Sequence, residues 1–231
     1  MIKTIANSIL HVFYPQYCIK CNSSFISNKQ MLCNECLHQM PLTNFENIAN
    51  NEIDKLFWGK LKVEHGFALG YFNRGGIFQN LVHQLKYSSN KDAGLILGNL
   101  MGEAILNNEF YKKLDVVIPL PLHPLKMAKR GFNQAEIIAQ GIADKCNIPM
   151  LNKVAQRRVN TSTQTAKTRG ERFENMRNVF FIKNMELLKN KHVLLVDDII
   201  TTGASLEACG AVILTAENTK LYIGAAAYSV K

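Results

Sequence analysis

The sequence predicts an α/β fold, a doubly wound and largely parallel sheet, with a small separate domain at the N-terminus. From residue 67 onward, strand-like and helix-like segments alternate, which is typical of βαβ units around a parallel sheet. The first 40 residues instead carry closely spaced cysteines. With 231 residues, 47% of them hydrophobic, the chain can bury one substantial core and a small appendage.

The expected elements follow in a regular order. Strands are predicted at residues 67–72, 115–118, 179–182, 192–196 and 220–229, the last as a closing edge strand. Helices are predicted at 75–85, 92–106, 134–145 and from Thr201 to about Leu214. Residues 41–62 are polar and rich in asparagine, which indicates a connector, although Leu56, Phe57 and Trp58 suggest that part of it docks. We expect residues 1–62 to form the small domain with its connector, and residues 63–231 the α/β domain.

The segment 193–205, VLLVDDIITTGAS, is the most informative in the chain. Its apolar residues form a buried strand, and Asp197 and Asp198 follow where open α/β sheets bind ligands. The next five residues open a helix, whose N–H groups favour an anion, and they are Thr201, Thr202, Gly203, Ala204 and Ser205. Because a phosphate pocket excludes carboxylates unless they face something else, the acids predict ribose hydroxyls and Mg²⁺. The segment therefore predicts a site for a sugar phosphate.

Other structures can produce part of this pattern. An ordinary strand followed by an acidic turn and a threonine N-cap remains an alternative. The acidic pair of a receiver domain needs further residues on later strands, and too little chain follows Ser205. A Walker B strand needs a G-x-x-x-x-G-K-[ST] segment, which is absent because Leu61 follows Gly59-Lys60.

Two C-x-x-C pairs stand near the N-terminus, and their spacing predicts one metal site. Cys18 and Cys21 form the first pair, and Cys33 and Cys36 the second. Four thiolates at this spacing can close tetrahedrally on Zn²⁺ and leave no open position, so the zinc would be structural. A redox pair is disfavoured without a βαβ context, and disulfides are disfavoured because residues 1–13 do not form a secretory signal.

The remaining cysteines and the hydropathy support an intracellular chain. Cys146 and Cys209 have no nearby cysteine partner, which predicts reduced, buried side chains. No run approaches the ~20 apolar residues of a membrane span. We therefore expect a cytoplasmic protein with no membrane insertion.

Positive charge is concentrated between residues 121 and 177, which hold eleven Lys and Arg but four Asp and Glu, a net of +7 of the chain's +9. A stiff proline-rich loop at 119–124 follows a predicted strand, with Lys126, Lys129 and Arg130 close behind. Two interpretations of these cations remain open: they bind an anion, or they form the solvated start of a helix. Residues 156–172 contain few apolar side chains and predict a mobile basic loop.

The 193–205 segment resembles the phosphoribosyl pyrophosphate (PRPP) motif of type I phosphoribosyltransferases. Further segments make the chain similar to the ComF competence family: the C-x-x-C pairs, Leu85-Lys86-Tyr87, the Pro-Leu-Pro-Leu-His stretch leading to residues 130–134, Thr163-Gln164-Thr165 and Arg172-x-x-Asn175. The resemblance implies a type I phosphoribosyltransferase-like domain after a zinc-binding domain.

The resemblance also implies roles for individual residues. Asp197 and Asp198 would face the ribose hydroxyls of PRPP, and residues 201–205 its 5′-phosphate. Lys126, Lys129 and Arg130 take the place of the pyrophosphate loop by position and charge. Lys167, Arg169 and Arg172 belong to a loop of the kind that closes over PRPP.

Two functions follow as hypotheses. The first is a Mg²⁺-dependent phosphoribosyltransferase, linked through its family to natural transformation. The second is a non-catalytic single-stranded-DNA-binding competence factor, in which the PRPP pocket is vestigial or regulatory, basic charge supplies affinity, and Tyr14, Tyr17, Phe25 and Phe132 either stack on bases or pack in the core. The expected partners are PRPP, single-stranded DNA and other competence proteins such as a DNA helicase.

Overall fold

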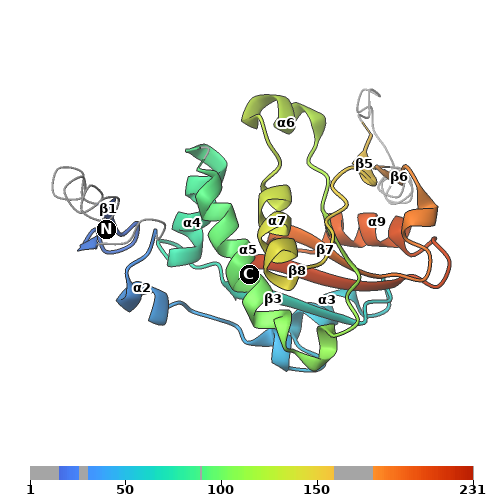
Figure 1. The fold of residues 1–231 in the computed structure, drawn as a ribbon, viewed down its shortest axis with the longest axis horizontal. Coiled ribbons are helices and arrows are strands. Elements are labelled where there is room, and N and C mark those ends of the chain that lie inside the picture. The colour runs from blue at the N-terminus through green and yellow to red at the C-terminus, as the bar shows by residue number, and fades with distance from the viewer. Residues whose placement is uncertain (1–15, 26–30, 89, 159–178, 231) are drawn as a thin grey trace, which may run out of the picture.

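A parallel four-stranded sheet forms the centre of the protein. The computed structural model describes residues 16–25, 31–88, 90–158 and 179–230. The sheet has the order β3 (His65–Tyr71), β8 (Lys220–Tyr228), β7 (His192–Ile200) and β4 (Val116–Pro119), and all three pairings are parallel. Figure 1 shows the sheet with helices around it. The α/β prediction with a largely parallel sheet is confirmed.

Helices cover both faces of this sheet. A Cβ added to Gly224 in β8 would lie beside Met101 of α5 (Lys91–Leu106). Leu221, three residues earlier in β8, lies against Gly210 of α9 (Ala204–Ile213). Because side chains alternate along a strand, α5 and α9 lie on opposite faces. Helix α7 (Gln134–Cys146) packs beside α5, where the backbones of Gly98 and Gly141 approach closely.

Three expectations about the strands were wrong. The last strand, β8, is not an edge strand but lies between β3 and β7, and residues 221–227 are buried on both faces. Strand β7 does not stop at Val196 but runs through both acids to Ile200, because Asp197 and Ile199 still pair with β8. Strand β6 (Phe180–Ile182) leaves the main sheet and pairs antiparallel with β5 (Ala155–Arg157).

Helices α4 (Ile77–Tyr87), α5 and α7 lie where the sequence predicts them, but one helix was missed. The proline-rich stretch is short, and α6 (Pro124–Arg130) follows it at once. His123 caps α6 by accepting from the backbone N–H of Leu125 at 3.2 Å, and Pro124 stands at its first position. Figure 1 shows α6 projecting beyond α7.

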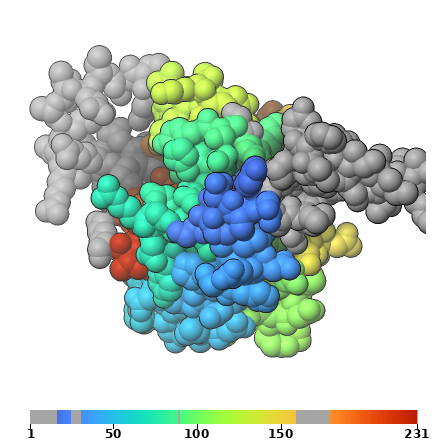
Figure 2. All heavy atoms as spheres, turned by 90° about the vertical axis from the view of Figure 1, so that its left-hand side faces the viewer, coloured from blue at the N-terminus to red at the C-terminus, as the bar shows by residue number. Residues whose placement is uncertain are grey.

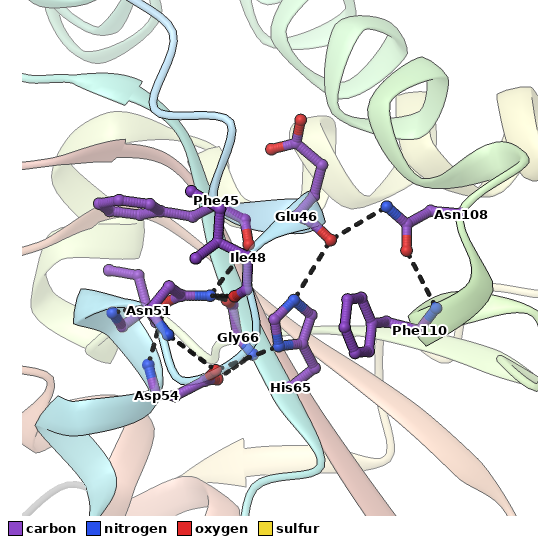
Figure 3. Close-up of polar contacts among 10 residues, drawn as sticks. Phe45, Glu46, Ile48, Asn51, Asp54, His65, Gly66, Asn108 and Phe110 are labelled. Atoms are coloured by element: carbon purple, nitrogen blue, oxygen red, sulfur yellow. Dashed lines mark hydrogen bonds and ion pairs between the residues drawn. The ribbon is translucent and has the colours of Figure 1, made fainter.

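The asparagine-rich connector is a packed layer. It forms the short helix η1 (Phe45–Asn47) and α3 (Glu52–Phe57), and the ring of Phe57 is 1% exposed, whereas Trp58 is 58% exposed. Asn51 caps α3 and donates its amide hydrogens to three backbone carbonyls, one of them that of Gly66 at 2.8 Å (Figure 3). Part of the connector therefore docks, as predicted, through Phe57 and the partly buried Leu56, whereas Trp58 is exposed and Ile53 contributes instead.

A buried histidine joins this layer to the sheet. In Figure 3, His65 at the start of β3 lies between the carboxylate of Asp54 and the carbonyl of Glu46, at 3.1 and 3.2 Å. The ring of Phe110, from the short helix η2 (Glu109–Tyr111), packs against His65 with centroids 4.2 Å apart. The short helix η3 (Met185–Leu187) precedes β7.

The cysteine-bearing segment forms a small unit of its own. Strands β1 (Gln16–Tyr17) and β2 (Ser24–Phe25) pair antiparallel, and α2 (Asn34–His38) follows them. This segment lies beside α4 (Figures 1 and 2), where Asn80 donates to the carbonyl of Ile19 at 3.2 Å and Lys20 donates to that of Gly75 at 2.7 Å. Among the residues with a described position, no helix has the length and apolar character needed to cross a membrane.

Candidate functional site

An open cleft of about 170 Å³ lies at the carboxyl ends of β4 and β7. Both acids of β7 open into it together with cations from three other elements. It is lined by Lys86, Leu120, Leu122, Lys126, Arg130, Asn133, Gln134, Ala135, Arg157, Asp197, Asp198 and Ser205. A smaller adjoining hollow of about 80 Å³ is formed by Asp197 and residues 199–206. The carboxyl end of a parallel sheet is the usual ligand side of such folds.

The two neighbouring acids of the cleft have different surroundings. Asp197 accepts a hydrogen bond from the backbone N–H of Asp198 at 2.8 Å. Burial, reinforced by the negative charge of Asp198, raises the pKa of Asp197 to about 7. Asp198 instead forms an ion pair with Lys86, whose Nζ lies 2.7 Å from its Oδ2. One acid is therefore neutralised by a lysine, while the other holds its proton more tightly than usual.

The helix predicted from Thr201 begins three residues later, because residues 201–203 form a tight turn and α9 starts at Ala204. Gly203 is the N-cap of α9 with φ of +73°, and a Cβ there would lie 3.1 Å from the ring of Phe57. Only glycine fits this left-handed position against the ring without strain. Thr201, Thr202 and Ser205 are exposed, and Thr202 Oγ1 accepts from the N–H of Ala204 at 3.5 Å. The free N–H groups and hydroxyls at the start of α9 suit an anionic oxygen.

The basic side of the cleft comes from α6 and β5. Lys126 and Arg130 line the cleft, whereas Lys129 does not. Arg130 donates to Gln134 at 2.7 Å, and the ring of Phe180 lies 5.3 Å beneath the guanidinium of Arg157. Lys167, Arg169 and Arg172 lie outside the described residues.

Two buried amide side chains shape this side. Asn133 is 7% exposed, donates to the carbonyl of Leu120 at 2.9 Å and caps α7. Gln134 is 2% exposed and holds Arg130. These contacts fix the loop after β4 to the start of α7, so that α6 carries its cations over the cleft.

Four polar or charged cleft residues were not among the site residues predicted from the sequence: Lys86, Asn133, Gln134 and Arg157. A signal existed for Lys86, because it is the only Lys, Arg, Asp or Glu in α4 and directly follows the buried Leu85. A charged residue next to the apolar stripe of such a helix is a candidate for a specific partner. For Arg157, the sequence showed only general basicity.

The four N-terminal cysteines form a second candidate site. Their Sγ atoms all lie within 4.8 Å of one another, and those of Cys21 and Cys33 are 3.6 Å apart. Four Zn–S bonds of about 2.3 Å in tetrahedral geometry place sulfurs about 3.8 Å apart, so the cluster fits Zn²⁺. In the described part of the chain, no other group of three or more His, Cys, Asp or Glu is arranged for a metal.

The surroundings lower the pKa of two of these thiols, Cys18 and Cys21, the second through a hydrogen bond with Ser23, whereas burial raises the pKa of Cys36. Burial would raise the pKa of Cys18, but hydrogen bonds from the backbone of Cys21, Cys33 and Lys20 outweigh it and lower this pKa to about 6. The two remaining cysteines lie outside this cluster. Cys209 is fully buried, and Cys146 is half-buried.

Comparison with known proteins decides the family. Residues 91–228 match the phosphoribosyl transferase domain. The chain belongs to this family. It is also 25% identical to competence protein F of Haemophilus influenzae over 213 residues, which cover 84% of this chain and 89% of that protein. Competence protein ComFC of Streptococcus pneumoniae is 29% identical over 191 residues, 82% of this chain and 77% of that protein. Within the phosphoribosyltransferases, the chain is a ComF-family protein.

Other matches are shorter. DNA utilization protein YhgH of Escherichia coli is 28% identical over 130 residues, which cover 54% of this chain and 56% of that protein. The glutamine PRPP amidotransferase of B. subtilis, solved with ADP and GMP, is similar over 62% of this chain and 30% of its own, with 18% identity and a TM-score of 0.44.

Proposed function

We propose that the cleft binds PRPP together with Mg²⁺. The observation that supports this most is the joining of three chemically different groups in one place: the acid pair of β7, the hydroxyl-rich start of α9, and the cations Lys126, Arg130 and Arg157. PRPP carries hydroxyls, a terminal phosphate and a pyrophosphate, which need these three kinds of partner. A simple anion site would not place two carboxylates beside the phosphate-binding turn.

Each part of the ligand has a proposed partner. Asp197 and Asp198 would accept from the ribose hydroxyls and hold Mg²⁺, which neutralises phosphate charge. The turn from Thr201 to Ser205 would receive the 5′-phosphate. Lys126 and Arg130 would face the pyrophosphate. Lys129, which lies off the cleft, and Lys167, Arg169 and Arg172, outside the described residues, remain predictions for this role.

The reaction we propose is pentosyl transfer. A nucleophile of the acceptor forms a bond to C1 of the ribose while the C1–O bond to pyrophosphate breaks, and the pyrophosphate leaves with the bonding electrons. The cations of α6 would stabilise the charge that develops on this leaving group. The acids would orient the ribose so that C1 faces the acceptor.

The four-cysteine cluster would hold a structural Zn²⁺. Its complete set of four thiolates leaves no position for a substrate. We propose that it stabilises the cysteine-bearing segment and fixes that segment against α4.

The biological setting follows from the relatives. Two are named as competence proteins and one as a DNA utilization protein, so we propose that this chain serves DNA uptake or use. A second candidate function, DNA binding by a non-catalytic protein, is favoured by the exposed cations of α6 and by the exposed Arg158. Its charge would supply affinity for any DNA sequence.

Calorimetric titration with Mg²⁺ and PRPP tests the proposal. Wild type should bind, and the double variant Asp197→Asn/Asp198→Asn should lose at least about 100-fold in affinity, because charge-assisted contacts contribute about 1.5–3 kcal/mol each. The control Asp144→Asn/Glu186→Gln removes two exposed acids away from the cleft and should bind as wild type does. Circular dichroism of each variant separates lost binding from lost folding. Equal affinity of wild type and the cleft variant would show that the site is wrong.

A further inference from the structure

The Lys86–Asp198 ion pair is unusual because it lies inside the cleft and not on the open surface. The Lys86 side chain is 19% exposed and that of Asp198 is 13% exposed, with 2.7 Å between Nζ and Oδ2. Holding two charges at low exposure costs desolvation energy, so such a pair is weak evidence for a stabilising role. Its position among the cleft residues calls for a functional explanation.

The fold brings this lysine to the acids from a distant element. Lys86 lies in the last turn of α4, while Asp198 lies near the end of β7, and the lysine is the helix's only Lys, Arg, Asp or Glu. At the start of α4, Lys20 of the cysteine segment donates a hydrogen bond to the carbonyl of Gly75. Asn80 of α4 donates in turn to the carbonyl of Ile19 in that segment. Both ends of the helix are therefore fixed, and its last turn presents Lys86 to the cleft.

Lys86 already donates to a carboxylate oxygen that a ribose hydroxyl would use. Asp198 Oδ2 accepts from the lysine, and Asp197 Oδ1 already accepts from the N–H of Asp198. A ribose diol that binds Asp198 through Oδ2 competes with the ammonium as donor to this oxygen. The displaced lysine then needs a new anion nearby, because an unpaired ammonium at this low exposure is costly.

We propose that Lys86 is a binding residue for the pyrophosphate group, exchanged from Asp198 to the ligand when PRPP binds. The exchange is balanced. Asp198 loses the ammonium and gains ribose hydroxyls, while Lys86 loses a carboxylate and gains phosphate oxygens, for which a lysine is a good point-charge partner. The ligand that best satisfies both partners carries a diol next to a pyrophosphate.

This inference rests on the proposed PRPP function and adds a criterion of selectivity to it. Ribose 5-phosphate offers the hydroxyls but no pyrophosphate, so it breaks the ion pair without giving Lys86 a partner. PRPP and inorganic pyrophosphate both supply the anion. Lys86 therefore discriminates ligands by their pyrophosphate and not by their sugar.

The test is calorimetric titration of three ligands, PRPP, pyrophosphate and ribose 5-phosphate, each with Mg²⁺, into Lys86→Gln, Lys86→Arg and wild type. Removal of one charge-assisted hydrogen bond should weaken PRPP and pyrophosphate about 10- to 100-fold in Lys86→Gln. Ribose 5-phosphate should bind that variant as well as it binds wild type, or more tightly, because the competing ammonium is gone. Lys86→Arg keeps the charge and should recover most of the PRPP affinity.

Lys55→Gln is the matched control, because Lys55 is an exposed lysine of α3 that pairs with Glu52. It should leave all three affinities unchanged. Equal weakening of PRPP and ribose 5-phosphate in Lys86→Gln would overturn the inference, since Lys86 would then act only through the shape of the acid pair. Unchanged PRPP affinity would also overturn it, while the proposed function would stand. Failure of wild type to bind any of the three ligands would overturn both.

Discussion

The cysteine cluster and the cleft are both built from charged or ionisable side chains, but they differ in how their contacts are completed. In the cluster, four sulfurs lie within 4.8 Å of one another and converge on one point. In the cleft, acids, cations and hydroxyls come from five elements and face an open volume of about 170 Å³. One set can be satisfied by a single ion, whereas the other needs a large ligand of mixed chemistry.

This difference separates a structural site from a binding site. When four protein ligands fill all coordination positions of a metal ion, no substrate can bind to the ion. The free energy of metal binding then stabilises the folded state. The cleft holds groups whose charges are only partly compensated, such as Asp197 with its raised pKa. Perturbed groups of this kind in a cleft are typical of functional sites.

The largest effect is expected in the cluster. Cys36→Ser removes one of the four proposed zinc ligands and should reduce zinc from about one ion per chain to nearly none, because the remaining three thiolates would no longer form a closed site. The N-terminal segment should unfold with it, since structural zinc contributes on the order of 10 kcal/mol to folding. Elemental analysis and amide hydrogen exchange measure both changes. Cys146→Ser, outside the cluster, should retain its zinc; equal zinc in both variants would contradict a four-thiolate site.

The second effect concerns Asp197 and pH. Its pKa is about 7 in the folded protein, against an ordinary value of 3.8, so the folded state binds the proton more tightly. The stability that this group contributes is fully present below about pH 4 and is lost as pH rises to about 7. Asp197→Asn should therefore be more stable than wild type at pH 8, by on the order of a few kcal/mol, and the gain should shrink toward pH 4. Urea unfolding at several pH values tests this, and a pH-independent difference would contradict it.

Binding should depend on the same proton in the opposite sense. Mg²⁺ and ribose hydroxyls require the ionised carboxylate, so affinity for Mg²⁺-PRPP should rise from pH 6 to pH 8.

A smaller effect is expected at the turn before α9. Gly203→Ala should destabilise the protein by about 1–2 kcal/mol for the left-handed conformation alone, with an added cost from the Phe57 ring. Gly59→Ala is a matched control, because φ is +70° there and nothing lies within 4 Å of the new Cβ. Thermal unfolding of the two variants gives the cost of the ring contact as their difference. No difference between them would show that Phe57 does not constrain the turn.

The smallest effect concerns DNA. Replacing Arg157, Arg158, Lys167 and Arg169 by Gln should weaken oligonucleotide binding at low salt. It should also flatten the salt dependence, by about one unit of slope for each phosphate that the protein no longer neutralises. Fluorescence anisotropy at two salt concentrations measures this. If cations are shared, saturating Mg²⁺-PRPP should also weaken DNA binding. Absence of salt-sensitive binding in wild type would remove the DNA-binding candidate.

The sequence predicted those features that depend on local pattern. Buried residues 193–196 and the helical spacing in α4 predicted the presence of a strand and a helix there, although not the end of the strand, because hydrophobic periodicity reports burial directly. The C-x-x-C spacing likewise predicted that four sulfurs meet. The central place of β8 was missed because an apolar run shows burial but not strand order.

The side-chain pairs of the cleft show the same limit. Asp197 and Asp198 were found because they stand side by side in the chain, whereas Lys86 lies 112 positions before Asp198 and meets it only in the fold. The sequence could not show that the neighbouring acids differ, with one paired to a lysine and the other holding its proton. That difference comes from burial and from α4, not from the motif.

A crystal structure of the protein with bound Mg²⁺ and PRPP would decide whether the cleft is the ligand site. We expect the 5′-phosphate on the backbone N–H groups of residues 201–205, the ribose hydroxyls on Asp197 and Asp198, and the pyrophosphate toward Lys86, Lys126 and Arg130. PRPP bound elsewhere on the protein, with the Lys86–Asp198 pair intact and the cleft at β7 empty, would contradict it.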